Sequence, residues 1–326
     1  MHTTIRKLTY WLIPVLFACS TAALAAEKAG DYPNKPIRYI IGASPGAGAE
    51  FVARIVSQIL HDAWGENVVV DPRPGGGGVI AANVAVNADP DGYTLYQNGF
   101  GLLINGAAGR LKYDVLKKFI PAVRLTSQPY ILLVQKNMKA KTVQDLIKLS
   151  QTKPLTYAGS AGIGSTVHLG MERLAILSKM KLKYIPYKGS APSIRALMGG
   201  EIQMAAGSAM SAIAALGTGK VRAFATLGLK RIPVLPDLPT LAEQGYPGWS
   251  ITNAYMLWVQ EGTPQPIIDA LNRVVSKGMN SPAVEKKLAA SGSEGADPIS
   301  PKDLKALVAK EYADTQDMVK RLNLKF

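Results

Sequence analysis

Two glycine-rich loops carry the residues best suited to bind a small anion. The first, Gly42 to Glu50, connects an apolar strand to an amphipathic helix that we expect to start near Phe51. The second, Gly159 to Thr166, also follows a strand and precedes a helix. Helix starts offer unpaired amides and a positive dipole end, and glycine lets a ligand approach the backbone. Two such loops in two half-sheets predict one ligand held between them.

The glycine spacing in the first loop excludes the commoner phosphate motifs. Gly42, Gly46 and Gly48 form G-x-x-x-G-x-G. This is neither the dinucleotide motif G-x-G-x-x-G nor a P-loop, because no Gly-Lys-Ser/Thr follows. A tight turn without a ligand is the alternative for this loop taken alone, and the hydroxyl residues of the second loop have the alternative role of helix caps.

Residues for catalysis or metal binding are scarce. After the N-terminal segment the chain has no cysteine and only His61 and His168. The sequence therefore lacks the residues that a metal enzyme or a Cys/His hydrolase needs. Ser165 and His168 are three residues apart, but no G-x-S-x-G elbow presents a nucleophile. We expect no catalytic residue, no metal and no cofactor; an exported α/β hydrolase or transferase of unknown substrate is the alternative.

The N-terminus has the pattern of an export signal. Two basic residues precede an uncharged run, 8–26, which ends in the A-x-A cleavage motif at 23–25. This predicts a signal peptide at 1–25, cleaved after Ala25, and a periplasmic protein. A membrane anchor is the alternative. The only cysteine, Cys19, lies in a loose lipoprotein box, but the bulky Phe17 fits that box poorly, so we favour simple export over lipidation.

Composition and charge indicate a globular protein that attracts anions. The chain has 326 residues, 48% of them hydrophobic, which is enough for two domains with real cores. Removing the two basic residues of the signal lowers the formal charge from +14 to +12, and a basic surface speeds encounter with anions. Nucleic acid is not expected, because the lysines are scattered and no nucleic-acid motif occurs. An interaction module that binds acidic polymers is a further alternative.

Strands and helices alternate along the chain, which predicts an α/β fold with mostly parallel sheets covered by helices. A first crossing between domains is expected near 127–129, and the strand 251–259 is expected to cross back. The tail is expected to be helical and to cover the first domain. The expected strands are 38–41, 67–71, 93–97, 130–134, 155–158, 182–185, 202–205, 221–226 and 251–259, and the expected helices include 51–64, 79–87, 142–150, 191–198 and 210–216.

About ten short segments, in this order, resemble the periplasmic solute-binding proteins of tripartite tricarboxylate transporters, the Bug (Bordetella uptake gene) receptors. No single segment is decisive, but the ordered set is highly specific and covers nearly the whole mature chain. The segments are YPNKPIR at 32–38, PGAGAE at 45–50, RPG at 73–75, PDGYTL at 90–95, YD at 113–114, SAGIGS at 160–165 with HL at 168–169, PYKG at 186–189, PTLAE at 239–243 and GTP at 262–264.

The resemblance implies a type II-like periplasmic-binding-protein fold, in which two mostly parallel sheets flanked by helices form two lobes joined by two crossing strands. Lobe 1 would comprise 31–127 plus 251–326, and lobe 2 would comprise 128–250. The lobes would close over a small organic carboxylate. The family's role implies a monomer that delivers this ligand to membrane components of a transporter, without enzymatic activity.

The resemblance also places a binding site on the two loops, which in this family grip a carboxylate through amides, hydroxyls and ordered water. The family's usual pattern in the first loop is G-G-x-T-D. Here its second glycine is replaced by Ala47, its threonine by Ala49 and its aspartate by Glu50, so a threonine hydroxyl is lost. Glu50 either complements the helix dipole or holds a water or a ligand amino group. The ligand stays open among a dicarboxylate, an aromatic acid, an amino acid and a nicotinate-like compound. The predicted ligand-binding residues are Ser44, Ala47, Gly48, Ala49, Glu50, Ser160, Gly164, Ser165, Thr166 and Tyr187.

Overall fold

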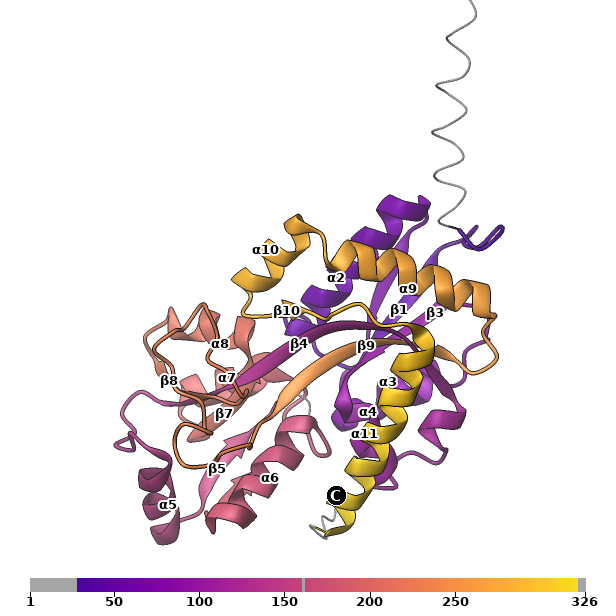
Figure 1. Ribbon diagram of the computed structural model, residues 1–326. Helices are drawn as coiled ribbons and strands as arrows, with labels where there is room; N and C mark the ends of the chain where they lie inside the picture. The colour runs from indigo at the N-terminus through magenta and orange to yellow at the C-terminus, as the bar shows by residue number, and fades with distance from the viewer. Residues whose placement is uncertain (1–27, 160–161, 322–326) are drawn as a thin grey trace, which may run out of the picture.

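The computed structural model describes residues 28–159 and 162–321, which form alternating strands and helices (Figure 1). The predicted signal peptide and the predicted site residue Ser160 lie outside these ranges. The strands are β1 (Ile37–Ile41), β2 (Val68–Pro72), β3 (Thr94–Asn98), β4 (Phe119–Gln135), β5 (Leu155–Ala158), β6 (Leu182–Tyr184), β7 (Met204–Ser208), β8 (Val221–Thr226), β9 (Thr252–Gln260) and β10 (Glu294–Gly295).

Helices cover both faces of these strands. None of the helices in the described part of the chain combines the length and the apolar character that a membrane span requires. The helices are α2 (Gly48–Trp64), α3 (Val79–Ala85), α4 (Phe100–Ala107), α5 (Val143–Thr152), α6 (Thr166–Ser178), α7 (Ser190–Gly199), α8 (Ala209–Leu216), α9 (Gln265–Met279), α10 (Pro282–Ala290) and α11 (Pro301–Arg321), with short 3-10 turns η1 (Gly76–Gly78) and η2 (Val115–Lys117).

The strands follow the order β2-β1-β3-β9-β4-β7-β5-β6, with β8 and β10 also paired to β4. Strand β1 runs parallel to β2 and β3, and β5 runs parallel to β6 and β7. Strand β4 pairs with β9 up to Pro129 and with β7 and β8 from Tyr130 onward. The predicted α/β fold with two parallel groups joined by crossing strands is thus confirmed (Figure 1).

We call the elements from β1 to η2 and from β9 to α11 the first lobe, and those from α5 to β8 the second lobe; the residue boundaries of the lobes stay a prediction. Side chains alternate along β1. Tyr39 and Ile41 join one core with α2 and α9, whereas Ile40 joins the core under α3, α4 and α11. The alternation explains the continuous apolar run, because a strand covered on both faces is buried everywhere. Full burial of a side chain such as Ile40 stabilises the fold by about 1.5–3 kcal/mol.

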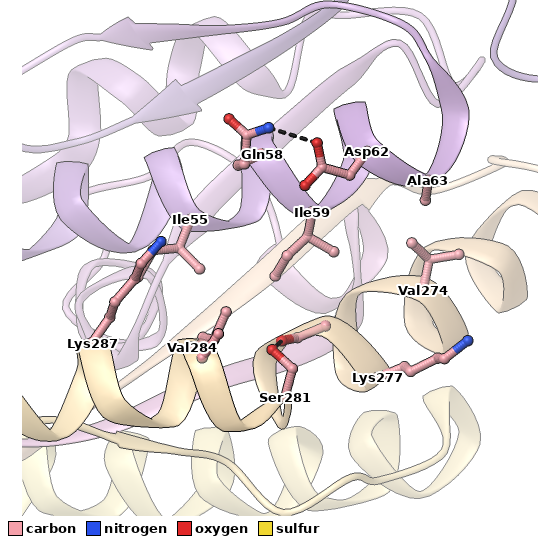
Figure 2. A pocket seen from close by; sticks show the side chains of 12 residues that line it. Ile55, Gln58, Ile59, Asp62, Ala63, Val274, Lys277, Ser281, Val284 and Lys287 are labelled. Atoms are coloured by element: carbon pink, nitrogen blue, oxygen red, sulfur yellow. Dashed lines mark hydrogen bonds between the residues drawn. The ribbon is translucent and has the colours of Figure 1, made fainter.

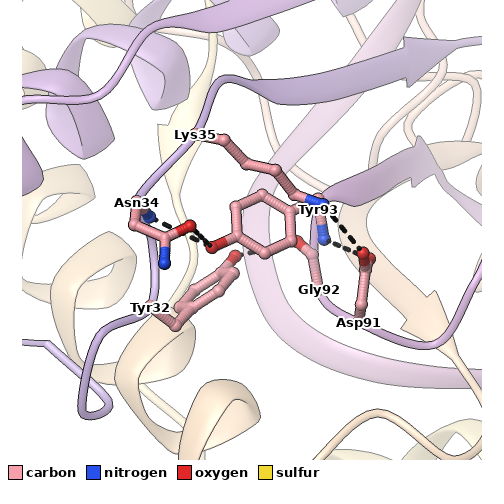
Figure 3. Close-up of polar contacts among 6 residues, drawn as sticks. All are labelled: Tyr32, Asn34, Lys35, Asp91, Gly92 and Tyr93. Atoms are coloured by element: carbon pink, nitrogen blue, oxygen red, sulfur yellow. Dashed lines mark hydrogen bonds and ion pairs between the residues drawn. The ribbon is translucent and has the colours of Figure 1, made fainter.

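Two segments that carry the family resemblance fasten together ahead of β1 and β3 (Figure 3). The Tyr93 hydroxyl donates to Asn34 Oδ1 at 2.9 Å and accepts from the Asn34 amide at 3.0 Å. The ammonium of Lys35 lies 3.4 Å from an Asp91 carboxylate oxygen and 4.2 Å from the centre of the Tyr93 ring. These motifs therefore hold the N-terminal edge of the first lobe.

Three elements differ most from the sequence expectation. Strand β4 begins at Phe119, well before the predicted strand 130–134. Helix α2 begins at Gly48 instead of Phe51, so three predicted loop residues form its first turn. Helix α4 was not predicted, because its glycines at 101 and 106 weaken the helical signal over only eight residues. Packing against α11 stabilises α4 in spite of these glycines, since Leu103 of α4 and Leu304 of α11 belong to one core.

Candidate functional site

A cavity of about 60 Å³ lies at the start of α2, between the two lobes. Its walls come from the first loop, from the carboxyl end of β3, from the start of α7 and from β9. At ~30 Å³ for each water molecule, this volume has room for about two waters, which is comparable to the space that one carboxylate group needs. The lining residues are Gly42, Ala43, Ala47, Gly48, Ala49, Gln97, Asn98, Ser190 and Tyr255, and none of them carries a charged side chain.

Two helices begin at this cavity without a side-chain cap. Ala47 precedes α2 in an extended conformation, and Gly189 precedes α7; neither offers a capping side chain. The first amides of each helix lack intrahelical acceptors, and each helix contributes the positive end of its dipole. The cavity therefore presents donors and partial positive charge to an anion without any cationic side chain.

The first loop touches the second lobe directly. Ser44 Oγ donates to the Lys188 carbonyl oxygen. A Cβ added at Gly48 would lie 3.1 Å from both Cβ and Oγ of Ser208, so glycine permits this close approach. The amide of Ser208 in turn donates to Ser190 Oγ at 3.4 Å. The loop, α7 and the start of α8 thus meet around one point.

Gln97 fixes the first turn of α2 from the first lobe. Its Nε2 donates to the Ala49 carbonyl oxygen at 2.8 Å, and its Oε1 accepts from the Tyr39 hydroxyl at 2.8 Å. Burial in the core raises the pKa of Tyr39, so this phenol stays protonated and keeps donating. The side chain of Gln97 is therefore committed to holding the helix start in place.

Glu50 turns back on its own loop. Its Oε2 accepts from the Gly46 amide at 2.7 Å, and its Oε1 accepts from Arg54 Nε at 3.0 Å. The Gly46 amide and then the Arg54 guanidinium hold the pKa of the Glu50 carboxyl below its usual value, against the opposing effect of partial burial. The carboxylate sits in the first turn of α2, where a negative charge complements the dipole. Glu50 does not line the cavity.

The second loop uses its polar groups to build its own turn. Ser165 caps α6, since its Oγ accepts from the His168 amide at 3.3 Å, and His168 Nδ1 accepts from the Gly164 amide at 3.2 Å. Burial, and then the nearby Arg110 charge, lower the pKa of His168 to about 4. The imidazole is therefore neutral at pH 7, as an acceptor nitrogen requires.

Arg110 connects this second loop to the first lobe, and sequence reasoning missed it. Its Nη1 donates to the Ile163 carbonyl oxygen and, at 2.7 Å, to Asn105 Oδ1. Asn105 also donates to the Gly77 carbonyl oxygen at 2.9 Å. A Cβ at Gly77, where φ is +68°, would lie 2.1 Å from the Ile163 carbonyl oxygen. The four-glycine loop therefore serves close packing against the opposite lobe.

The structure brings some predicted residues together and separates others. Ala47, Gly48 and Ala49 line the cavity, and Ser44 contacts the opposite lobe beside it. Gly162, Ile163 and Gly164 of the second loop lie against Gly77 or Arg110, and none of the described residues of this loop lines the cavity. Thr166 lines a different cavity, and the Tyr187 hydroxyl donates to Glu201 Oε2 at 3.0 Å.

Five residues at the cavity or at the contact between the lobes were not predicted from the sequence. Four line the cavity, Gln97, Asn98, Ser190 and Tyr255, and the fifth, Arg110, binds the second loop. A signal existed for Ser190, which follows Gly189 at a strand-to-helix turn like the two loops. Gln97 and Asn98 end a strand parallel to β1, at the edge where ligands usually bind. No sequence pattern marks Arg110.

Cavity size alone does not locate a site in this molecule. A hollow of about 460 Å³ lies on the outside of the first lobe between α2, α9 and α10 (Figure 2). Ile59, Val274 and Val284 form its apolar floor, and no residue of either loop reaches it. Within residues 28–159 and 162–321, no group of three or more metal-ligating side chains is placed to hold a metal ion.

Comparisons with known proteins bear on the family and the fold. A family model for the tripartite tricarboxylate transporter family receptor matches residues 52–324. The chain is similar to the protein BugT of Bordetella pertussis (strain Tohama I), with 30% identity over 316 residues that cover 94% of this chain and 95% of BugT. The fold is similar to that of the periplasmic binding protein BugD, with a TM-score of 0.81 and 27% identity over 90% of this chain and 99% of that one.

Two further solved structures contain carboxylates. One is an R. palustris protein with adipate, at a TM-score of 0.83 and 30% identity over 90% of this chain and 99% of that chain. The other is MatC from Rhodopseudomonas palustris with bound malate, at a TM-score of 0.82 and 28% identity over 88% and 100%. The chain therefore belongs to the tripartite tricarboxylate transporter family receptors, which bind substrates and are not enzymes.

Proposed function

We propose that this receptor captures a small organic carboxylate between its two lobes and delivers it to the membrane components of a tripartite tricarboxylate transporter. One observation carries the proposal. The uncapped starts of α2 and α7, one from each lobe, border a cavity whose lining has no charged side chain. Such a site favours a single anionic group held by neutral donors. Relatives with adipate and malate bound support a carboxylate as the ligand class.

The proposed ligand-binding set keeps every predicted residue and adds Ser190. Glu50 belongs to the set because its carboxylate accepts from the Gly46 amide and so shapes the first loop, without contact to the ligand. The first loop would supply amides, and Ser190 would supply a hydroxyl and the start of α7. The second loop would complete the closed site beside Gly77. The full proposed set is Ser44, Ala47, Gly48, Ala49, Glu50, Ser160, Gly164, Ser165, Thr166, Tyr187 and Ser190.

Neutral donors suit a receptor that must also release its ligand. Each hydrogen bond contributes about 1 kcal/mol net, or up to about 3 kcal/mol when the acceptor is charged. Four or five such bonds account for micromolar affinity, about 8 kcal/mol. A ligand that touches both lobes stabilises the closed arrangement selectively, so closure is a shift of population. The contacts of Ser44 with Lys188 and of Gly48 with Ser208 belong to that closed arrangement.

Export and assembly complete the proposal. The segment 1–25 would direct the chain to the periplasm and be removed after Ala25, with lipidation at Cys19 disfavoured. The mature chain would work as a monomer, without nucleic acid or a cofactor. Mass spectrometry of the protein purified from the periplasm would give its N-terminus and its mass, and a mass that includes a lipid on Cys19 would contradict this part.

A matched pair of serines in α7 tests the proposed site. Ser190 lines the cavity, whereas Ser193 is buried one turn later and donates to the Ser190 carbonyl oxygen at 2.8 Å. A thermal-shift screen that includes malate and adipate would first identify a binding carboxylate, and calorimetry would follow. We expect Ser190→Ala to weaken binding about tenfold and Ser193→Ala to leave the affinity unchanged. Equal affinities for both variants and the wild type would remove Ser190 from the site.

A further inference from the structure

A second cavity, of about 240 Å³, also lies between the lobes. Helices α4 and α11 of the first lobe form one side, and α6 with the segment 250–252 forms the other. At ~30 Å³ for each water molecule, the cavity has room for about eight waters, or for one small metabolite. Thr166 of the proposed ligand-binding set also lines this cavity, but neither the proposed function nor the family comparison assigns the cavity itself a role.

This cavity lies on the opposite face of β9 from the carboxylate cavity. Thr252 lines the second cavity and Tyr255 lines the first. Residues three apart on a strand point to opposite faces. The cores agree, since Met256 packs with α4 and α11 and Leu257 packs with α2 and α9. The two cavities share no lining residue.

The second cavity combines an apolar wall with charges of both signs. Ile104, Leu169 and Met318 supply apolar surface. Arg173 reaches the cavity from α6, and Glu311 and Asp314 reach it from α11. Among the described residues, no ion pair within 4.0 Å joins Arg173 to either carboxylate.

The charges around Glu311 come from several elements. Burial has the largest effect on Glu311 and raises its pKa. The neighbouring Asp314 also raises the pKa, whereas Arg124 on β4 lowers it. A carboxylate desolvated in this way gains when a cation approaches it. Arg173 faces the same space from the other lobe. A molecule with an ammonium, a carboxylate and an apolar body would complement all three features.

We propose that this cavity binds an apolar α-amino acid. Its ammonium is held by Glu311 and Asp314, its carboxylate by Arg173, and its side chain lies against the apolar wall. Because the bound molecule touches both lobes, it stabilises the arrangement in which Ser44 and Gly48 meet the second lobe. Amino acid binding therefore raises the affinity of the first cavity for its carboxylate, a coupling that rests on the proposed function, whereas the binding itself does not.

Calorimetry with L-leucine and two of its analogues tests the site in the full mature protein. Isoamylamine lacks the carboxylate of leucine, and 4-methylpentanoate lacks its ammonium. We expect leucine to bind and each analogue to bind about tenfold more weakly or worse, because each loses a charge-assisted hydrogen bond. Equal binding of leucine and both analogues would overturn the assignment of the charges.

Variants then place the bound leucine. Glu311→Gln should weaken leucine about tenfold without changing malate affinity, and Glu285→Gln, at an exposed carboxylate of α10, should change neither. Arg173→Gln should weaken the binding of leucine but leave the binding of isoamylamine unaffected. Circular dichroism of each variant confirms that it folds.

The coupling is measured separately. Saturating leucine should tighten malate binding about fivefold or more.

The outcomes separate this inference from the proposed function. Leucine that fails to bind, or that is lost with Ser190→Ala and kept with Glu311→Gln, overturns the second site. In the latter case leucine occupies the first cavity, and the proposed function stands. Failure of every carboxylate in the screen overturns the proposed function and leaves leucine binding intact. Leucine binding that does not change malate affinity overturns the coupling.

Discussion

The two glycine-rich loops have similar sequence patterns and different structural roles. The first loop ends at a helix without a side-chain cap, and its Gly48 borders both the cavity and Ser208 of the other lobe. The second loop spends Ser165 and His168 on its own turn and offers the Ile163 carbonyl oxygen to Arg110. In the proposed function, the first loop binds the ligand through amides that its own turn leaves unused. The second loop shows that a similar glycine-rich turn can also form the contact between the two lobes.

We call the contact of Gly77 and Arg110 with Ile163 the clasp. Substitution of Gly77 in the clasp should weaken carboxylate binding more than substitutions in the first loop. Gly77→Ala forces a Cβ to within 2.1 Å of the Ile163 carbonyl oxygen, at a positive φ of +68°. We expect carboxylate affinity to fall about thirtyfold, corresponding to about 2 kcal/mol of strain and lost contact between the lobes. Calorimetry with the carboxylate selected by the screen measures this loss.

Gly109 supplies the control for that variant. It has nearly the same φ, +69°, but a Cβ there meets no atom within 4 Å. Gly109→Ala therefore introduces similar backbone strain without touching the opposite lobe. If both variants lost the same affinity, the interlobe contact of Gly77 would have no role in binding.

The first loop should respond through steric crowding without backbone strain. Gly48→Ala adds a methyl 3.1 Å from Ser208 Cβ and Oγ, and Gly48 does not have a positive φ. Since overpacking costs about 1–3 kcal/mol, we expect affinity to fall about tenfold and the melting temperature to change little. Gly199→Ala in α7, where the new Cβ meets only Glu201 Oε1 at 3.8 Å, is the control. An unchanged affinity in Gly48→Ala would argue against close approach at this point.

Arg110→Met tests whether the second loop closes the lobes. The change removes hydrogen bonds from a charged donor to Ile163 and Asn105. We expect about fivefold weaker carboxylate binding, about 1 kcal/mol, because part of the loss is recovered by solvent. Small-angle scattering of the ligand-free variant should show a larger radius of gyration. A variant that binds normally and scatters like the wild type would show that Arg110 does not act as a clasp.

Glu50→Gln should have the smallest effect on binding, since the Glu50 carboxylate faces its own loop. Its pKa is lowered in the folded state, so its stabilising effect is present above the unfolded pKa and is lost as pH falls through the folded pKa. The variant should be slightly less stable than the wild type at pH 7, and the difference should vanish well below pH 4.5. A large loss of carboxylate affinity would instead place Glu50 at the ligand.

The sequence predicted the parts of the fold that rest on local patterns. The apolar run 39–41 and the turns that bound it predict β1 because a strand buried on both faces needs that run. The start of α2 was placed three residues late, since a helix that opens on Gly48 without a capping side chain gives no N-terminal signal. Helix α4 depends on packing against α11, which no local pattern reports.

The glycine-rich pattern predicted where the first loop lies, whereas contacts between distant side chains could not be predicted. The resemblance assigned Ala47, Gly48 and Ala49 to the site, and the structure places them in the wall of the cavity; their role in binding stays a prediction. Arg110 reaches Ile163 across 53 residues of sequence. Ser190 joins the first loop only because α7 starts opposite α2. Such contacts depend on the tertiary fold, and no local pattern in the sequence indicates them.

A crystal structure of the complex with the carboxylate selected by the screen tests the central claim most directly. The account predicts one carboxylate group in the cavity beside Gly48 and Ser190, within hydrogen-bond distance of the first amides of α2 and with no cationic side chain in contact. A carboxylate bound to an arginine or lysine side chain, away from the starts of α2 and α7, would contradict it.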